Sequence, residues 1–278
     1  MFGPNTDITT NIVTDFSHRD IHFINLYKEL SNLMLDKAGL HRHKYDVLFM
    51  GGSGTLAIES VFWSVLHPID VIGNEGLWHD KWLEFDRRQP KSKTNGTHKL
   101  YCQLETSNGK TFDDADCIVD GISSFPYYDI PKNTKIFVTT SNKQLGSLAG
   151  LSIIFIRKDF WNEMQSDAIF SYMNLARYKN YGFIGQTAFT SLFSRLNNKF
   201  IFRCPSRSFH KIDRNSELLI DIFGGEPSPV FVVPKTDIPI EIAIKYNLYG
   251  MNTDSKNYSI FTYTSDTYKY ERFHKEFK

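Results

Sequence analysis

The sequence predicts an α/β protein with a mostly parallel central sheet sandwiched by helices, followed by a small C-terminal α+β lobe. Between about residues 45 and 160, short apolar runs alternate with turn and helix signals, which is typical of βα units. Over roughly the last eighty residues this rhythm changes, which indicates a separate arrangement of strands and helices. Hydrophobic residues make up 41% of the 278-residue chain, which is enough for a packed core and excludes a disordered chain.

Each expected element follows from local apolar patterning. In the large part, strands are expected at residues 45–50, 70–73, 100–104, 117–120, 135–140 and 151–156. Helices are expected at 21–37, from the turn at 51–55 to about 66, at 78–86, and in two pieces over 171–195 broken near Gly182 and Gly185. The small lobe should have strands at 230–233 and 258–263 and helices at 214–223, 239–246 and 268–277. We expect an extended N-terminal segment (1–20), a large domain (21–200) and a small domain (201–278).

Composition narrows the class of function. Lys and Arg total 32 against 31 Asp and Glu, so no global field favours nucleic acid or acidic membranes as partners. The spacing of Cys102, Cys117 and Cys204 fits neither a disulfide framework nor a metal site. No apolar stretch approaches the ~20 residues needed to cross a bilayer, and the N-terminus lacks the order of a signal peptide. We therefore expect a soluble, cytoplasmic protein that binds no metal.

A glycine-rich turn, Gly-Gly-Ser-Gly-Thr at residues 51–55, lies between a predicted strand and a predicted helix. Backbone N–H groups and the positive end of the helix dipole converge there, which suits a phosphate monoester. The spacing matches neither a Walker loop nor a dinucleotide motif. Taken alone, the turn is equally consistent with having no ligand.

Three side chains follow neighbouring predicted strands. Asp120 ends the strand at 117–120, where a carboxylate at the carboxyl edge of a parallel sheet faces the ligand crevice. It could pair with the pyridine nitrogen of pyridoxal phosphate, although capping a helix is the commoner use of a lone Asp. Lys143 follows the next strand, and its amine is a nucleophile only if burial lowers its pKa; otherwise it is a solvated surface group. Trp78 could stack on a flat cofactor or pack in the core. With the glycine-rich turn, these residues together indicate a pyridoxal-phosphate site.

With these motifs the sequence resembles the class V, fold-type I pyridoxal-phosphate aminotransferases, above all the 2-aminoethylphosphonate–pyruvate, serine–pyruvate and alanine–glyoxylate transaminases. The resemblance extends from the N-terminus to about residue 159 and recurs at the C-terminus. The matching segments are Gly3-Pro4, 17–23 (SHRDIHF), 52–55 (GSGT), 74–78 (NEGLW), 105–109 (ETSNG), 118–125 (IVDGISSF) and 141–146 (SNKQLG).

The resemblance implies pyridoxal 5′-phosphate as cofactor and a role for each matching residue. Lys143 would hold the cofactor as a Schiff base and move the proton between the substrate Cα and the cofactor C4′. Asp120 would pair with the pyridine nitrogen, Trp78 would stack on the ring, and Ile122 would pack on its opposite face. The remaining implied cofactor contacts are Ser53, Gly54, Thr55 and Asn142 at the phosphate, Thr106 near the ring hydroxyl, and Thr187 at the phosphate of a partner subunit. It also implies a homodimer with the active site at the interface.

The sequence departs from this family in two places. It is shorter, because a polar loop at residues 87–99 replaces a βα portion and the stretch between 109 and 117 is also cut short. In addition, Thr262 stands where the family has an arginine that binds the substrate carboxylate with its guanidinium fork. Arg19, His18 and Arg272 are other candidates for that task, although a surface position is favoured for each.

Three functions remain open. The first is an aminotransferase that moves an amino group between a small amine or amino acid and a 2-oxo acid. The second, favoured by the missing arginine, is a pyridoxal-phosphate-dependent lyase or decarboxylase on the same fold. The third, suggested by the deletions, is a non-catalytic scaffold. All four cofactor-binding elements are intact, which argues against the third function, and we rank the first function ahead of the second.

Overall fold

The structure is a computed structural model, and it describes residues 20–88, 96–179, 186–197, 205–251, 253–263 and 267–278. The expected extended segment at 1–20 lies almost entirely outside this part, as does most of the polar loop at 87–99. No helix in the described ranges is long and apolar enough to cross a lipid bilayer.

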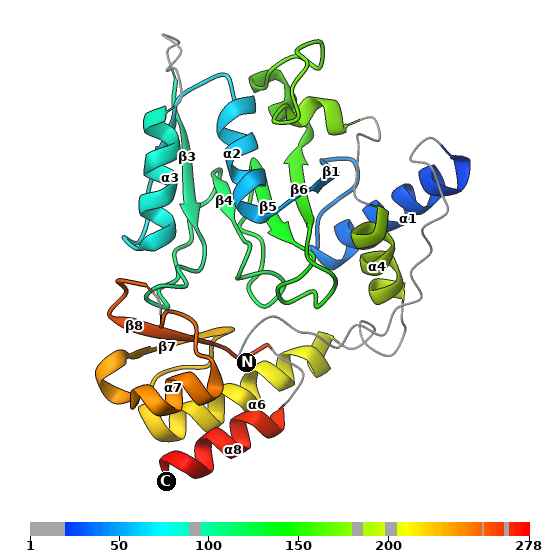
Figure 1. The fold of residues 1–278 in the computed structure, drawn as a ribbon. Helices are drawn as coiled ribbons and strands as arrows, with labels where there is room; N and C mark the ends of the chain where they lie inside the picture. Colours follow the sequence, from blue (N-terminus) through cyan, green and yellow to red (C-terminus); the bar gives the residue numbers. More distant parts are fainter. Residues whose placement is uncertain (1–19, 89–95, 180–185, 198–204, 252, 264–266) are drawn as a thin grey trace.

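The central sheet has six strands in the order β1-β6-β5-β4-β3-β2 (Figure 1). Their bounds are β1 Tyr45–Gly51, β2 Ile69–Val71, β3 His98–Cys102, β4 Ile118–Asp120, β5 Ile136–Thr140 and β6 Leu151–Arg157. Strands β2 to β5 pair in parallel, whereas β6 is antiparallel to both β5 and β1. The predicted mostly parallel sheet is therefore confirmed, and its parallel strands all end at one edge.

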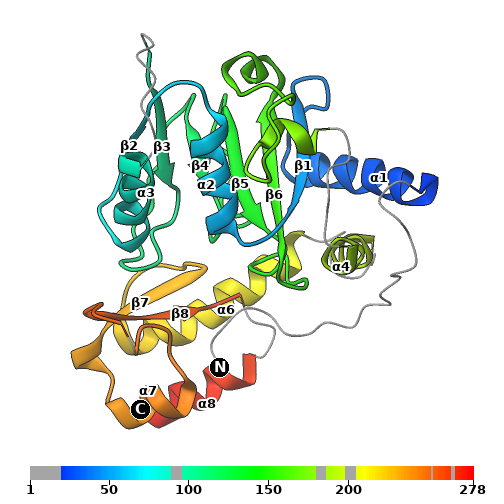
Figure 2. The same ribbon diagram turned by 45° about the horizontal axis from the view of Figure 1, so that its top comes forward.

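Helices cover both faces of this sheet. Successive side chains of each strand point to opposite sides, and both sets are apolar, so each face is buried against helices. Phe49, Phe137 and Phe155 belong to one buried cluster with α1 (Ile21–Lys37) and α4 (Gln186–Asn197). Their strand neighbours pack in a second cluster with α2 (Gly54–Ser64) and α3 (Leu77–Arg88), and these are Leu48, Met50, Ile136, Val138, Ile154 and Ile156. Figure 2 shows α2 and α3 on one side of the sheet and α1 and α4 toward the other.

A second, two-stranded sheet lies beyond the carboxyl ends of the parallel strands (Figure 1). Its strands β7 (Val230–Pro234) and β8 (Asn257–Phe261) are antiparallel. Three helices accompany them: α6 (Pro205–Phe223), α7 (Ile240–Tyr246) and α8 (Thr267–Phe277). The Ser259 hydroxyl donates to the Thr106 carbonyl at 2.7 Å, and the Asn257 amide donates to the Ser107 carbonyl at 3.3 Å. These bonds connect the small sheet to the loop that follows β3.

Two segments differ most from their expected structure: α6 begins at Pro205, nine residues before the expected start at 214, and the helix expected from residue 171 is not formed there. Residues 171–174, expected to be helical, form turns, and the described residues that follow them, up to 179, contain a short 3₁₀ helix, η2 (Leu175–Tyr178). The buried Asn174 side chain donates to the carbonyls of Ser166 and Ile169 and accepts from the amide of Ala176. Because an Asn side chain offers the backbone these alternatives to helical bonds, the chain folds back on itself here.

Candidate active site

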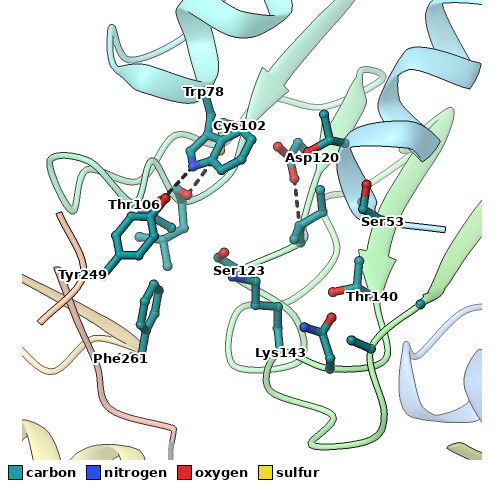
Figure 3. A pocket seen from close by; sticks show the side chains of 17 residues that line it. Ser53, Trp78, Cys102, Thr106, Asp120, Ser123, Thr140, Lys143, Tyr249 and Phe261 are labelled. Carbon is teal, nitrogen blue, oxygen red and sulfur yellow. Dashed lines mark hydrogen bonds between the residues drawn. The ribbon is translucent and has the colours of Figure 1, made fainter. Parts of the chain in front are cut away.

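A cavity of about 400 Å³ lies at the carboxyl edge of the central sheet, between that sheet and the small one. Nine of the ten predicted site residues line it: Ser53, Gly54, Thr55, Trp78, Thr106, Asp120, Ile122, Asn142 and Lys143. The tenth, Thr187, lies in helix α4, but its side chain is outside the described part of the chain. Figure 3 shows the side chains that surround the cavity. Residues from five separate segments of the sequence thus meet in one space.

The glycine-rich turn brings the N-terminus of α2 to the cavity. The Ser53 hydroxyl caps the helix by accepting from the Leu56 amide at 3.2 Å. The amides of Gly54 and Thr55 lie in the first turn, where an α-helix provides no acceptor for them. A Cβ atom on Gly54 would lie 2.4 Å from the Ile122 side chain, so any larger residue would close this corner. The turn therefore presents amide donors and the positive end of a helix dipole to the cavity.

Thr140, the last residue of β5, adds a hydroxyl to the same corner (Figure 3). The residue is buried, and its Oγ1 is one of a few buried side-chain atoms in the described ranges that have no hydrogen-bond partner. Leaving a buried hydroxyl unpaired costs about 1–3 kcal/mol. An oxygen-rich ligand anion at the N-terminus of α2 would satisfy it, so the corner fits a phosphate group.

Asp120, at the end of β4, is a buried carboxylate with two firmly held oxygens. Oδ1 accepts from the Ile122 amide at 3.0 Å, and Oδ2 accepts from the Trp82 indole at 3.1 Å. Burial raises the pKa of Asp120 to about 6, the two N–H donors oppose that rise, and the nearby Glu105 adds to it. A cationic N–H group in the cavity would compensate the desolvated carboxylate.

Trp78 is held by the segment that follows β3. The buried Glu105 carboxylate accepts from the amides of Trp78 and His79 at 3.0 and 3.2 Å, in the first turn of α3. The Trp78 indole donates to Thr106 Oγ1 at 2.9 Å. Gly76 permits this approach, because a Cβ there would lie 2.4 Å from the Glu105 side chain. Backbone and ring of Trp78 are thus both fixed against the cavity wall.

Lys143 lies in a tight turn after β5. Gly146 has a positive φ of 62° and its amide donates to the Lys143 carbonyl at 3.0 Å. The neighbouring Gln144 side chain donates to the Ser123 carbonyl at 2.6 Å and anchors the turn to the Asp120 segment. Burial lowers the pKa of the Lys143 amine, and the charge of Asp120 acts in the opposite direction. A lowered pKa leaves more of the lysine as the neutral amine, and the neutral amine is the nucleophile.

The end of the cavity toward the small sheet is aromatic. Phe261 and Tyr249 line it, with ring centroids 5.7 Å apart and edge-to-face geometry. The Lys143 Nζ lies 5.1 Å from the centre of the Phe261 ring. Because the ring face is the negative side of the aromatic quadrupole, this wall favours a cationic amine.

Thr262 does not line the cavity. Its hydroxyl donates to the Ser228 carbonyl, and its own carbonyl accepts from Asn215 at 2.7 Å, in a fully buried position. Thr262 therefore links α6 to the small sheet through these two hydrogen bonds. Arg272 is exposed on α8, while His18 and Arg19 lie outside the described residues. Among the described lining residues Lys143 is the cation.

Several lining residues were not identified from the sequence: Cys102, Leu104, Ser123, Thr140, Ala149, Gly150, Tyr249 and Phe261. Trp82, which bonds to Asp120 from behind the cavity, was also missed. Its spacing of four residues from Trp78 was an available signal, since helical neighbours at i and i+4 share a face. Tyr249 and Phe261 offered none, because the position of the small sheet comes from tertiary packing.

Comparison with known proteins shows the fold. No protein-family model matches the sequence, and no curated protein matches it either. One solved structure that matches is a phosphoserine aminotransferase from Cytophaga hutchinsonii, with a TM-score of 0.73 and 17% identity over 94% of this chain and 91% of that one. A PLP-bound phosphoserine aminotransferase from Trichomonas vaginalis has a TM-score of 0.68 and 15% identity over 94% of this chain and 90% of that one. A ureidoglycine–glyoxylate aminotransferase from Bacillus subtilis has a TM-score of 0.71 and 15% identity over 96% of this chain and 87% of that one. The chain has the fold-type I fold of pyridoxal-phosphate-dependent transferases, as the sequence predicts.

Proposed function

We propose that the protein is a pyridoxal-phosphate-dependent aminotransferase that moves an amino group between a small amine or amino acid and a 2-oxo acid. The observation that supports this most is the meeting of Lys143 and Asp120 in one cavity beside the N-terminus of α2. The three solved structures named above are aminotransferases by their names, and one of them is named as having PLP bound.

The residues of the cavity fit this cofactor. The amides at the start of α2, the Ser53 hydroxyl and the unpaired Thr140 hydroxyl would bind the phosphate. Trp78 and Ile122 would enclose the ring between them, and Asp120 would accept a hydrogen bond from its nitrogen. Asn142 and Thr106 complete the wall of the cavity. In this assignment the positive charge on the ring nitrogen would lower the raised pKa of Asp120 and favour its ionised form.

The bound cofactor would supply an electron sink for the carbanion that forms when the substrate Cα loses its proton. The chain provides the groups that move this proton. The Lys143 Nζ, with a pKa lowered by burial, would be the base and acid that carries the proton to and from the Cα. Phe261 and Tyr249 exclude water at the entrance for the substrate. Asp120 would stabilise the protonated ring nitrogen on which this electron sink depends.

We also propose a homodimer, with Thr187 of a partner subunit completing the phosphate site, and a division into residues 1–20, 21–200 and 201–278. The dimer follows from the resemblance of the sequence to the class V aminotransferases. The separate buried cluster around the small sheet, which includes Leu219, Ile260 and Phe273, supports the domain division near residue 200.

Half-reactions with a panel of amino donors test this function. Purified protein loaded with pyridoxal phosphate is mixed with each donor, and the absorption spectrum of the cofactor is followed. We expect at least one donor to convert the cofactor to its pyridoxamine form, and a 2-oxo acid to restore the starting spectrum. The variant Lys143→Ala is the control and should show neither change.

The same experiment separates the alternative activities. Release of carbon dioxide or another fragment from the donor, without the pyridoxamine spectrum, would identify a decarboxylase or lyase instead. Protein that takes up no pyridoxal phosphate would contradict both kinds of enzyme.

A further inference from the structure

We propose that Trp82 is a positioning residue that holds Asp120 in place for the cofactor ring nitrogen through its indole N–H. The inference rests on the proposed function, because it assigns Trp82 a task toward the same cofactor. Trp82 does not line the cavity, so it acts through residues that do, and the lining residue to which it donates a hydrogen bond is Asp120.

The carboxylate of Asp120 is held from two sides. Trp82 Nε1 donates to Oδ2 at 3.1 Å, and the Ile122 amide donates to Oδ1 at 3.0 Å. A carboxylate held by one donor can rotate about its Cβ–Cγ bond, whereas two donors on different oxygens fix its plane. The second donor therefore determines which way the carboxylate faces.

Trp82 is itself held rigidly. It is fully buried, and its ring centroid lies 5.5 Å from that of Trp78 and 5.6 Å from that of Phe85. Long side chains packed on several sides have one rotamer, so the direction of the N–H is fixed by the core. This is the arrangement that precise support of a binding group requires.

Trp78 and Trp82 are four residues apart on α3 and therefore share a face of that helix. Each indole donates one hydrogen bond: Trp78 to Thr106 and Trp82 to Asp120. The first ring lies against the cavity, and the second holds the acidic group at its floor. One helix thus sets both the stacking surface and the ring-nitrogen partner.

Charge gives the bond a further consequence. Burial and the nearby Glu105 disfavour the ionised form of Asp120, while the Ile122 and Trp82 donors and the Cys102 thiol favour it, with a resulting pKa of about 6. Loss of the indole N–H would raise this pKa further and leave less carboxylate at neutral pH. The neutral acid cannot offset the charge of a protonated ring nitrogen.

The test compares wild-type protein with Trp82→Phe, which keeps an aromatic ring and removes the N–H. We expect the dissociation constant for pyridoxal phosphate to rise about tenfold, the scale of a hydrogen bond to a charged group. As the pH is lowered, affinity should be lost at a higher pH in the variant than in the wild type. A second probe, the analogue of pyridoxal phosphate with C–H in place of the ring nitrogen, should bind both proteins with nearly equal affinity.

The matched control is Trp161→Phe. The Trp161 indole also donates to a carboxylate, Asp46 Oδ2 at 2.8 Å, but neither residue lines the cavity. This variant should bind both probes as the wild type does. In the background Asp120→Asn, the change Trp82→Phe should add little, because the group through which it acts is gone.

Circular dichroism and thermal unfolding monitor the fold of each variant. If Trp82→Phe does not fold, Trp82→3-benzothienylalanine keeps the size of the indole and replaces only the N–H, and the same tenfold loss is expected. Equal affinity of a folded Trp82 variant and the wild type for pyridoxal phosphate would overturn the role of Trp82. So would an equal loss with the ring-carbon analogue, because the effect would then not pass through Asp120. Wild-type protein that binds no pyridoxal phosphate would instead overturn the proposed function.

Discussion

The two ends of the cavity differ in how their polar groups are held. At the end formed by the large sheet, Asp120 and Trp78 are fixed by hydrogen bonds from or to neighbouring segments, and Thr140 has an unpaired hydroxyl. At the end formed by the small sheet, Phe261 and Tyr249 meet the cavity with their rings, and the polar Thr262 faces away from it.

This difference separates two tasks. The rigid polar end has the groups that a charged, flat, phosphorylated cofactor needs in fixed positions. The aromatic end sets few directional demands, so it restricts a substrate mainly by shape and by attraction of a cation to a ring. We infer that the identity of the cofactor is determined by the large sheet and that of the substrate largely by the small one.

Thr262 gives the largest expected effect. Replacing it by Arg would bury a charge beside the Ser228 carbonyl in a fully enclosed position, and we expect a loss of at least about 3 kcal/mol in the free energy of unfolding. Thr262→Val, which removes only the hydroxyl, should cost about 1 kcal/mol. Urea denaturation measures both.

The Thr262→Val protein should also keep the donor KM of the wild type, because the side chain does not touch the cavity. A stable Thr262→Arg protein with an altered donor preference would show that this position does bind the substrate and would break the distinction between the two ends.

Asp120 gives a pH dependence that belongs to the cofactor end. Its pKa is raised from 3.8 to about 6 in the folded chain, so the folded state binds more protons than the unfolded state between these values. In the cofactor-free protein this carboxyl therefore stabilises the fold at low pH, and that contribution is lost as the pH rises from about 4 to 6. The full change amounts to about 3 kcal/mol.

The variant Asp120→Asn isolates this contribution. Urea denaturation at a series of pH values gives the unfolding free energies of wild type and variant. As the pH rises from about 4 to 6, the wild type should lose stability relative to the variant. Other carboxylates cancel in the difference. Two stability curves that stay parallel from pH 4 to 7 would contradict a buried carboxyl at this position.

How far the sequence predicts the molecule depends on the range of the interactions involved. The sheet and the cofactor end follow from local patterns: Asp120 ends a strand, Ser53 and Lys143 lie within three residues of the end of one, and parallel strands end at one edge. The turns at residues 171–174 escaped prediction, because they depend on where the Asn174 side chain finds its partners.

The residues at the substrate end of the cavity were also not predicted, because their positions depend on contacts between distant parts of the chain. Phe261 and Tyr249 come from segments whose only link to the cavity is the docking of the small sheet. A motif comparison placed an expected arginine at Thr262, but Thr262 lies in the turn after β8 and its hydroxyl donates to the Ser228 carbonyl, so Phe261 meets the cavity and Thr262 does not.

Phe261 gives the smallest expected effect. Its ring lies 5.1 Å from the Lys143 Nζ, so it should contact the amino group of a substrate that reacts there. For Phe261→Leu we expect the donor KM to rise about fivefold, the scale of one cation–ring contact, while the dissociation constant for pyridoxal phosphate stays unchanged. Steady-state kinetics and equilibrium binding provide the two values. A change in cofactor affinity with an unaltered donor KM would place Phe261 at the cofactor end instead.

The most direct test of this account is the site of covalent attachment. The protein is incubated with pyridoxal phosphate, reduced with borohydride, digested and mapped by mass spectrometry, with Lys143→Ala and the exposed-lysine variant Lys132→Ala as comparisons. We predict one phosphopyridoxyl group per chain, on Lys143, present in Lys132→Ala and absent from Lys143→Ala. Label on another lysine, or equal labelling of Lys143→Ala, would contradict the assignment of this cavity as the cofactor site.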